Sequence, residues 1–287
     1  MTSRFLYEAP ESFAQAASKL KACADARVIL GGTDLMVLLE KNVISVEKVL
    51  DLTKIPNVRD ITEREDHYLF GAGVTFAQLD QWAKAHPVYR ALGEAAVSIG
   101  TPQVRNIATW VGNLCNAVPS CDMGAPSLIF DAKVQTIDAA GDVKWLPVRE
   151  LFAGPKRTVL KHDELVTHIK LPMADGSARS SYQKFGPRKA SDLAYVGVGV
   201  LLRRDAEGRV ADLRIGLGAV GPTPLLVGGL ERFVGQRLDD ALCREIGDAA
   251  AQAAKPITDF RATEAYRREL VAVETERALR VCMDGLQ

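Results

Sequence analysis

Two glycine-bearing segments carry the residue types in this chain that are best suited to hold a charged ligand. The first reads VILGGTDL over residues 28–35, the second reads RNIATWVGNL over residues 105–114, and the glycines of each are expected to form a turn. Because glycine has no Cβ, Gly31 and Gly32 can adopt positive φ and point successive backbone N–H groups into one concavity. Hydroxyl and amide side chains within both segments can donate hydrogen bonds as well. Together the two segments predict a diphosphate site built mainly from backbone N–H groups.

Neither segment is a standard nucleotide-binding loop by itself. Neither matches G-x-G-x-x-G or G-x-x-x-x-G-K-[ST], so an ordinary Rossmann domain is disfavoured. A strand that ends in two glycines is also compatible with a simple tight turn. Since the segments lie far apart in the sequence, one ligand that touched both would have to be long and lie between two lobes.

Charge and composition exclude several classes of partner. Lys plus Arg number 36, Asp plus Glu number 36, and the two signs are interspersed. This balance argues against a nucleic-acid surface or a polybasic membrane anchor. No apolar stretch approaches the length of a membrane span, and the N-terminus has no apolar signal core. With 287 residues, the chain can bury a sizeable core in two or three lobes. We expect a cytoplasmic protein.

Cysteine and histidine spacing predicts neither a metal site nor a catalytic nucleophile. The five cysteines are scattered and contain no C-x-x-C pair. Cys115 and Cys121 are close in sequence, and we interpret them as small packed side chains. The four histidines lack metal-ligand spacing, and no G-x-S-x-G elbow indicates a hydrolase.

Hydrophobic periodicity predicts an α+β chain in three parts. In residues 1–55 strands and helices alternate: a strand near 5–7, a helix over 12–21, a strand over 27–30, a helix over 35–39 and a strand over 48–52. Residues 56–175 contain a strand over 67–73, a helix capped by Thr75, helices over 88–99 and 125–130, a hairpin of 133–137 with 143–146, and a strand over 165–172. A linker over 173–177 leads into residues 176–287, with strands over 181–185, 193–203 and 210–216 and helices over 238–255 and 263–283.

Five motifs, in this order, connect the chain to a known family. They are LGGTD at 30–34, TWVGN at 109–113, NAVPSCD at 116–122, GPKRTVL at 154–160 and YQKFGPRKASDLA at 182–194. In this order they resemble the FAD-binding medium subunit of the molybdenum hydroxylases, the family of xanthine dehydrogenase and carbon monoxide dehydrogenase. The resemblance implies a two-lobed FAD-binding domain of the vanillyl-alcohol-oxidase type, with lobes at 1–55 and 56–175. A smaller C-terminal domain of antiparallel strands and helices follows at 176–287.

The resemblance also implies which residues bind FAD. The pyrophosphate would lie between the two glycine segments, and Asp122 looks like the family acid that bonds a sugar or ribityl hydroxyl. Lys184 matches a lysine near the flavin, where a cation stabilises negative charge on the reduced ring or on the diphosphate. Ile99 and Ile169 fall at positions that pack against the flavin. The full implied set is Val28, Ile29, Leu30, Gly31, Gly32, Thr33, Asp34, Leu35, Ile99, Thr109, Trp110, Val111, Gly112, Asn113, Asp122, Ile169 and Lys184.

By the same resemblance, partner subunits carry the remaining cofactors. A large subunit would hold molybdopterin and a small subunit two [2Fe-2S] clusters, in a dimer of heterotrimers. Electrons would pass from the clusters through FAD to an acceptor such as NAD+, a quinone or oxygen. This chain itself would need no general base and no metal.

Several residues keep a structural alternative. Asp34 and Asp122 could each cap a helix, and Lys184 could be a solvated strand residue. Ile99 and Ile169 could belong to the core, and for Trp110 we favour the core over a contact with the cofactor.

Val111 departs from the family pattern, which usually has glycine there. A β-branched residue disfavours positive φ, so the backbone must keep a negative φ at Val111 or the diphosphate must sit further away. Two functional alternatives also remain open. The chain could be a stand-alone FAD oxidoreductase of the vanillyl-alcohol-oxidase type, or a flavin-free structural subunit in which Val111 marks a degraded site.

Overall fold

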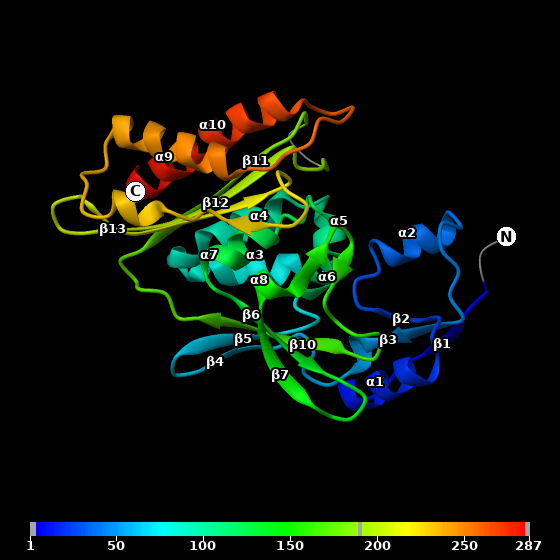
Figure 1. The fold of residues 1–287 in the computed structure, drawn as a ribbon. Helices are drawn as coiled ribbons and strands as arrows, with labels where there is room; N and C mark the ends of the chain where they lie inside the picture. The colour runs from blue at the N-terminus through cyan, green and yellow to red at the C-terminus, as the bar shows by residue number, and fades with distance from the viewer. Residues whose placement is uncertain (1–3, 189–190, 285–287) are drawn as a thin grey trace.

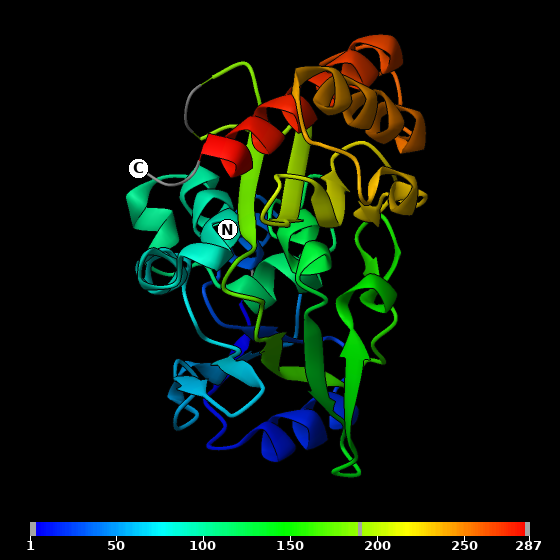
Figure 2. The same cartoon turned by 90° about the vertical axis from the view of Figure 1, so that its left-hand side faces the viewer.

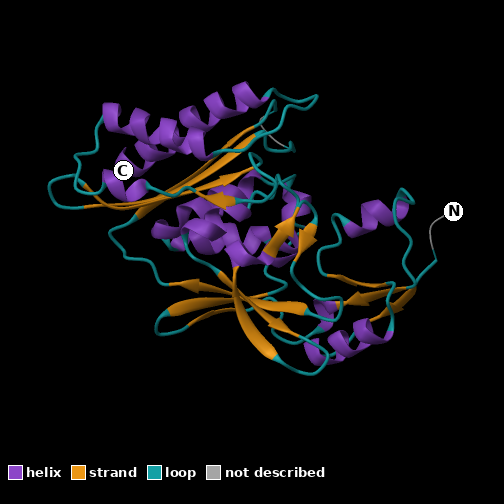
Figure 3. Cartoon of the chain, viewed as in Figure 1, coloured by secondary structure: helices purple, strands orange, loops and turns teal. Residues whose placement is uncertain are grey.

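The computed structural model describes residues 4–188 and 191–284. Its helices and strands are arranged in layers (Figure 1). Two helices cover the outer face of a C-terminal sheet, further helices lie between that sheet and a second, five-stranded sheet, and a small N-terminal sheet stands to one side (Figure 3). The α+β class predicted from the sequence is therefore observed.

The N-terminal sheet is parallel, with strand order β1-β3-β2. Alternate residues of its central strand face opposite helices, as the period of two in a strand requires. Val49 packs with Leu39 of the second helix, whereas Leu50 joins the main core with Ala17 and Leu20 of the first. The elements are β1 (Leu6–Glu8), α1 (Phe13–Ala22), β2 (Ala26–Ile29), α2 (Leu35–Glu40), β3 (Lys48–Asp51) and the 3-10 turn η1 (Leu52–Lys54).

The five-stranded sheet is antiparallel, with strand order β4-β5-β10-β6-β7. Its central strand carries alternating buried positions and pairs with a strand on each side. The predicted hairpin is present as β6 and β7, whereas the short β4 was not predicted. The strands are β4 (Ile61–Glu63), β5 (His67–Gly71), β6 (Lys133–Ile137), β7 (Val143–Pro147) and β10 (Leu165–Pro172).

Most helices of the middle part pack between the two larger sheets. The predicted cap at Thr75 is confirmed as a capping box, in which Thr75 and Gln78 exchange side-chain and backbone hydrogen bonds. The elements are α3 (Phe76–Ala85), η2 (Pro87–Tyr89), α4 (Arg90–Ser98), α5 (Pro102–Arg105), α6 (Trp110–Asn116), α7 (Gly124–Ile129), α8 (Val148–Leu151), and the small hairpin of β8 (Phe152–Gly154) with β9 (Arg157–Thr158).

The C-terminal part is an antiparallel sheet, β11-β12-β13-β14, with two long helices on its outer face (Figure 2). The three long strands and both helices were predicted, with β12 beginning three residues later than expected. The elements are β11 (Arg179–Phe185), β12 (Val196–Arg204), β13 (Val210–Gly218), β14 (Leu225–Leu226), η3 (Leu230–Phe233), α9 (Asp240–Ala253) and α10 (Glu264–Asp284).

Glycines on β12 and β13 let this sheet pack directly on α7. A Cβ on Gly216 would lie 2.5 Å from the carbonyl oxygen of Ala125, and a Cβ on Gly199 would lie 3.3 Å from the carbonyl carbon of the same residue. Side chains at these positions would push the helix away. The close packing fixes the position of β11 relative to the chain segment that enters α7. Residues of β11 and of that segment bind one another directly.

Candidate functional site

The two glycine segments touch each other. A Cβ on Gly31 would lie 2.2 Å from the carbonyl oxygen of Ile107 and 2.8 Å from the Cα of Ala108. Both residues belong to the second segment and immediately precede Thr109. Segments that are far apart in the sequence therefore lie in van der Waals contact, and only glycine at position 31 permits this approach.

The first segment is a loop between β2 and α2. Gly32 has φ +68°, the left-handed conformation that glycine adopts without a steric penalty. Among the described residues, the backbone N–H groups of Gly32, Thr33 and Asp34 have no hydrogen-bond acceptor. Asp34 occupies the N-cap position of α2, but its side chain makes no capping hydrogen bond. The loop thus offers adjacent unpaired donors, as an anion-binding concavity does.

The rest of the first segment lies on either side of this loop. Val28 and Ile29 are the last residues of β2, Leu30 leads into the loop, and Leu35 is the first residue of α2. The side chains of all four are partly buried.

From Thr109 onward the second segment is the first turn of a helix, and the expectation that its glycine forms a separate turn was wrong. Thr109 is the N-cap of α6, and its hydroxyl oxygen accepts a hydrogen bond from the N–H of Gly112 at 3.0 Å. Val111 keeps a negative φ because it is helical, so the substitution for the family glycine causes no strain. The first N–H groups of a helix lack partners within the helix and favour anions. In α6, however, the N–H of Trp110 donates to the carbonyl oxygen of Val74 at 3.3 Å and that of Gly112 to the hydroxyl of Thr109. Among the described residues, the N–H of Val111 is therefore the one that this first turn leaves to a ligand.

Three of the predicted contact residues have their side chains in the core. Trp110 is 1% exposed, its indole N–H donates to the hydroxyl of Ser127 at 3.0 Å, and its ring packs edge-on against Phe70. Val111 is buried as well, and Ile169 is fully buried in the central strand β10. The core interpretation of Trp110 is confirmed. The side chains of Trp110, Val111 and Ile169 are packed against other core residues, so they leave no exposed surface for a ligand to contact.

Asn113 uses its side-chain oxygen inside the protein. This Oδ1 accepts hydrogen bonds from the N–H of Met123 at 3.2 Å and from the thiol of Cys121 at 3.0 Å. The amide oxygen therefore links the end of the 116–122 segment to α6 by hydrogen bonds. The side-chain nitrogen of Asn113 is the group that could donate to a ligand. Burial raises the pKa of the Cys121 thiol well above its usual range, which agrees with the interpretation of this cysteine as a packed side chain.

Asp122 and Lys184 form a buried ion pair. The Nζ of Lys184 lies 2.9 Å from Oδ2 of Asp122 and also donates to the carbonyl oxygen of Ser98 at 3.2 Å. The hydroxyl of Tyr182 donates to the other carboxylate oxygen, Oδ1, at 2.9 Å. Burial raises the pKa of Asp122, and the charge of Lys184 with the two hydrogen bonds opposes that rise.

This geometry overturns two structural alternatives. Asp122 does not cap α7, because the N-cap position is Met123 and no side chain caps that helix. Lys184 is not a solvated strand residue, because its side chain is 11% exposed and bound on two sides.

Ile99 lies beside this ion pair. It follows Ser98, whose carbonyl binds Lys184, and is followed by Gly100 at φ +50°. The guanidinium of Arg105 donates to the carbonyl oxygens of Ile99 at 3.0 Å and Gly100 at 3.3 Å. Arg105, the last residue of α5, thereby links this turn to the start of the second glycine segment.

Sequence reasoning missed Tyr182 and Arg105. A signal existed for Tyr182, because it stands two residues before Lys184 in a predicted strand and so faces the same side. For Arg105 the sequence contains no comparable signal, since its partners are backbone carbonyls of a turn.

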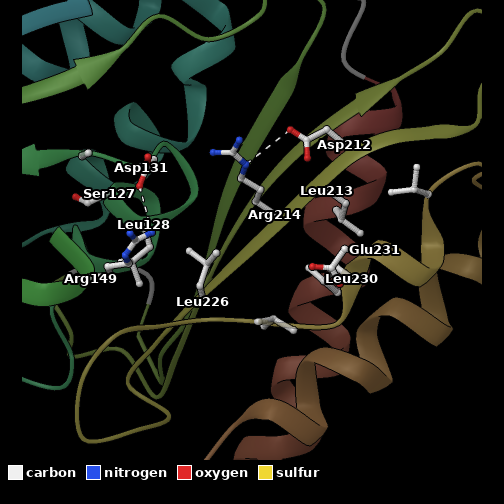
Figure 4. A pocket seen from close by; sticks show the side chains of 13 residues that line it. Ser127, Leu128, Asp131, Arg149, Asp212, Leu213, Arg214, Leu226, Leu230 and Glu231 are labelled. Carbon is white, nitrogen blue, oxygen red and sulfur yellow. Dashed lines mark ion pairs between the residues drawn. The ribbon is translucent and has the colours of Figure 1, made fainter. Parts of the chain in front are cut away.

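A cavity of about 410 Å³ opens elsewhere, between α7, α8 and the strands β13 and β14 (Figure 4). Arg149 and Arg214 line it, and each pairs with an aspartate at 3.7–3.8 Å. None of the predicted FAD contacts lines it. Within residues 4–188 and 191–284 no group of three or more His, Cys, Asp or Glu side chains is placed to hold a metal ion, and none of the helices there combines the length and the hydropathy that a membrane span requires.

Two family models cover nearly the whole chain. The one described as the FAD binding domain in molybdopterin dehydrogenase matches residues 3–174, and the one described as the CO dehydrogenase flavoprotein C-terminal domain matches residues 180–281. The chain belongs to this family of flavoprotein subunits. The resemblance drawn from the sequence motifs is confirmed, together with the fold class and with FAD as the family's cofactor.

Individual relatives of this family align over almost the full length. The xanthine dehydrogenase FAD-binding subunit of Escherichia coli O157:H7 is 29% identical over 276 residues, which are 95% of this chain and 94% of that protein. The carbon monoxide dehydrogenase medium chain of Hydrogenophaga pseudoflava is 28% identical over 278 residues, 96% of each chain. A solved structure of carbon monoxide dehydrogenase from the same organism superposes with a TM-score of 0.91 at 27% identity and covers 99% of both chains.

Proposed function

We propose that this chain binds FAD and acts as the electron-transfer subunit of a molybdenum hydroxylase. The contact between the two glycine segments carries the proposal, because residues of both segments then lie near enough to one another to bind one ligand. The unpaired N–H groups of Gly32, Thr33 and Asp34, together with that of Val111 at the start of α6, would hold the diphosphate. Leu30, Gly31, Thr109, Gly112 and Asn113 would shape this cradle and add the remaining donors.

Asp122, Lys184 and Ile99 would hold the other end of the cofactor. The carboxylate of Asp122 can accept hydrogen bonds from hydroxyl groups of the ribityl chain or ribose, since each of its oxygens has two acceptor positions. Lys184 would supply positive charge to the cofactor. Asp122 neutralises part of this charge through the ion pair. Half-buried Ile99 offers apolar surface beside them. Val28, Ile29 and Leu35 support the loop from the strand and helix on either side.

FAD, when bound, supplies the redox chemistry that would connect [2Fe-2S] clusters of a small partner subunit with an external acceptor such as NAD+, a quinone or oxygen. A large partner subunit would carry molybdopterin and act on the substrate. This chain would bind and orient the cofactor and tune its charge. We expect a dimer of heterotrimers located in the cytoplasm.

The relatives support a subunit rather than a stand-alone enzyme, because their names describe medium chains and FAD-binding subunits. The geometry at Val111 removes the reason for suspecting a degraded site. A helical N–H at this position points along the axis whether the residue is glycine or valine.

The test is electron flow in the assembled complex. The chain is purified with its large and small subunits, and the iron–sulfur clusters are reduced anaerobically with limiting dithionite. We expect the visible absorbance of the flavin to bleach once the clusters are reduced, and a complex reconstituted without this chain to show no flavin signal. Clusters that stay reduced beside an oxidised flavin, or a chain that never joins the complex, would contradict the proposal.

A further inference from the structure

Tyr182 is a buried tyrosine whose hydroxyl binds a residue of the proposed site. It is 4% exposed, and its hydroxyl donates to Oδ1 of Asp122 at 2.9 Å. Tyr182 and Lys184 are two residues apart on β11, so both side chains leave the strand on the same side. Tyr182 donates to Oδ1 of Asp122, and Lys184 donates to Oδ2 of the same carboxylate.

Gly197 makes the space for this hydroxyl. It lies on the neighbouring strand β12, where it pairs directly with Lys184. A Cβ on Gly197 would stand 2.5 Å from the hydroxyl oxygen of Tyr182 and 3.2 Å from the ring carbon that carries it. Any side chain there would displace the ring, so the hydrogen bond to Asp122 depends on glycine at this position.

A carboxylate bound at both oxygens has a fixed plane. Free rotation of Asp122 about its side-chain bonds would cost conformational entropy when a ligand bound, and the two donors remove that freedom beforehand. Each oxygen still has an acceptor position that is not used by Tyr182 or Lys184. Asp122 keeps 9% of its surface exposed, which leaves part of the group open to a ligand.

We propose that Tyr182 is a positioning residue for FAD, which acts by holding the carboxylate of Asp122 in place, and that Gly197 provides the room for it. The inference rests on the proposed function, since it assigns a role in binding the same cofactor. Tyr182 itself would not touch the reacting ring.

Tyr89 provides a matched control for the loss of a buried tyrosine hydroxyl. It is 2% exposed, its hydroxyl donates to the carbonyl oxygen of Pro172 at 2.8 Å and accepts from the N–H of Ala174 at 2.8 Å. These partners belong to the end of β10 and the segment after it, and none of them touches Asp122. Tyr89→Phe thus removes two hydrogen bonds to backbone groups, at a place distant from Asp122, whereas Tyr182→Phe removes one to a carboxylate.

The experiment titrates full-length apoprotein with FAD and follows the quenching of flavin fluorescence. We expect FAD to bind about tenfold more weakly to Tyr182→Phe than to the wild type, because a hydrogen bond to a charged group is lost. Tyr89→Phe should bind FAD as the wild type does, with a similar drop in Tm. Gly197→Ala should weaken FAD binding in the same direction as Tyr182→Phe.

A double-mutant cycle separates positioning from general structural damage. If Tyr182 acts through Asp122, then Tyr182→Phe should change the FAD dissociation constant little in an Asp122→Ala background, where no side-chain acceptor remains for its hydroxyl. Full additivity, or a Tyr182→Phe variant with wild-type FAD affinity, would overturn the inference while leaving the proposed function intact. A wild-type chain that takes up no FAD would overturn the proposed function and this inference with it.

Discussion

Replacing Gly31 by alanine is expected to separate the two glycine segments. The new methyl group would stand 2.2 Å from the carbonyl oxygen of Ile107 and 2.8 Å from the Cα of Ala108. The first distance is more than 1 Å below the 3.4 Å at which ordinary van der Waals contact begins. The obstructing atoms are backbone, so no side-chain rotation relieves the clash. One segment must move by about 1 Å relative to the other.

The displacement should affect both stability and ligand binding. Overpacking of this kind costs about 2 kcal/mol, which lowers the Tm of a chain of this size by about 3 °C. Losing the alignment of one charge-assisted hydrogen bond to the diphosphate weakens FAD binding by about tenfold or more. The two quantities are measured by differential scanning calorimetry of the apoprotein and by fluorescence titration with FAD.

Gly228→Ala is the control for the substitution itself. It stands in an exposed segment with no heavy atom within 4 Å of the added Cβ. We expect an unchanged FAD affinity and a Tm equal to or slightly above that of the wild type. A Gly31→Ala variant with wild-type Tm and FAD affinity would refute the contact between the segments as the basis of the site.

Three further predictions concern the surroundings of the site. Because burial raises the pKa of Asp122, FAD affinity should fall with decreasing pH at values above the usual aspartate range, as protonation removes the charge that faces Lys184. Asp122→Asn should abolish that dependence, and a titration series over pH checks it. Trp110→Phe should lower the free energy of unfolding in urea by about 1–3 kcal/mol through the lost hydrogen bond to Ser127, with unchanged FAD affinity. Gly216→Ala should cost about 1–3 kcal/mol by pushing the C-terminal sheet from α7, and should also weaken FAD binding, since Lys184 moves with that sheet.

Each of these has a contrary result. A flat pH profile for the wild type would show that Asp122 does not contribute its charge to binding. A large loss of FAD affinity in Trp110→Phe would mean that the indole contacts the cofactor after all. Normal FAD binding in a strongly destabilised Gly216→Ala would separate the sheet–helix contact from the site.

The elements with a strong local pattern were predictable from the sequence. Ser12 and Thr75 are each followed by a helical apolar period, and both cap the helix that follows. The hairpin β6–β7 follows from alternation on either side of a turn sequence. By contrast, β14 and η3 are too short to show a period and were not predicted.

In the second glycine segment, the glycine was interpreted as a turn although the threonine three residues earlier favours the start of a helix. Gly112 suggested a turn, although Thr109 three residues earlier is a good N-cap and its hydroxyl binds the N–H of Gly112. A helix beginning at Trp110 satisfies both residues.

The partners of Asp122 could not be predicted, because they come from the chain some 60 residues further on. Local reasoning offered a helix cap for Asp122 and solvent for Lys184. Tertiary packing of β11 against the 116–122 segment gives each group a better partner than either alternative.

The most direct test of the account is a crystal structure of the full-length chain grown with FAD. We predict that the pyrophosphate lies between the loop of Gly31 and Gly32 and the first turn of α6, within hydrogen-bond distance of backbone N–H groups from both. A flavin bound elsewhere, or a pyrophosphate held by only one of the two segments, would contradict the central claim.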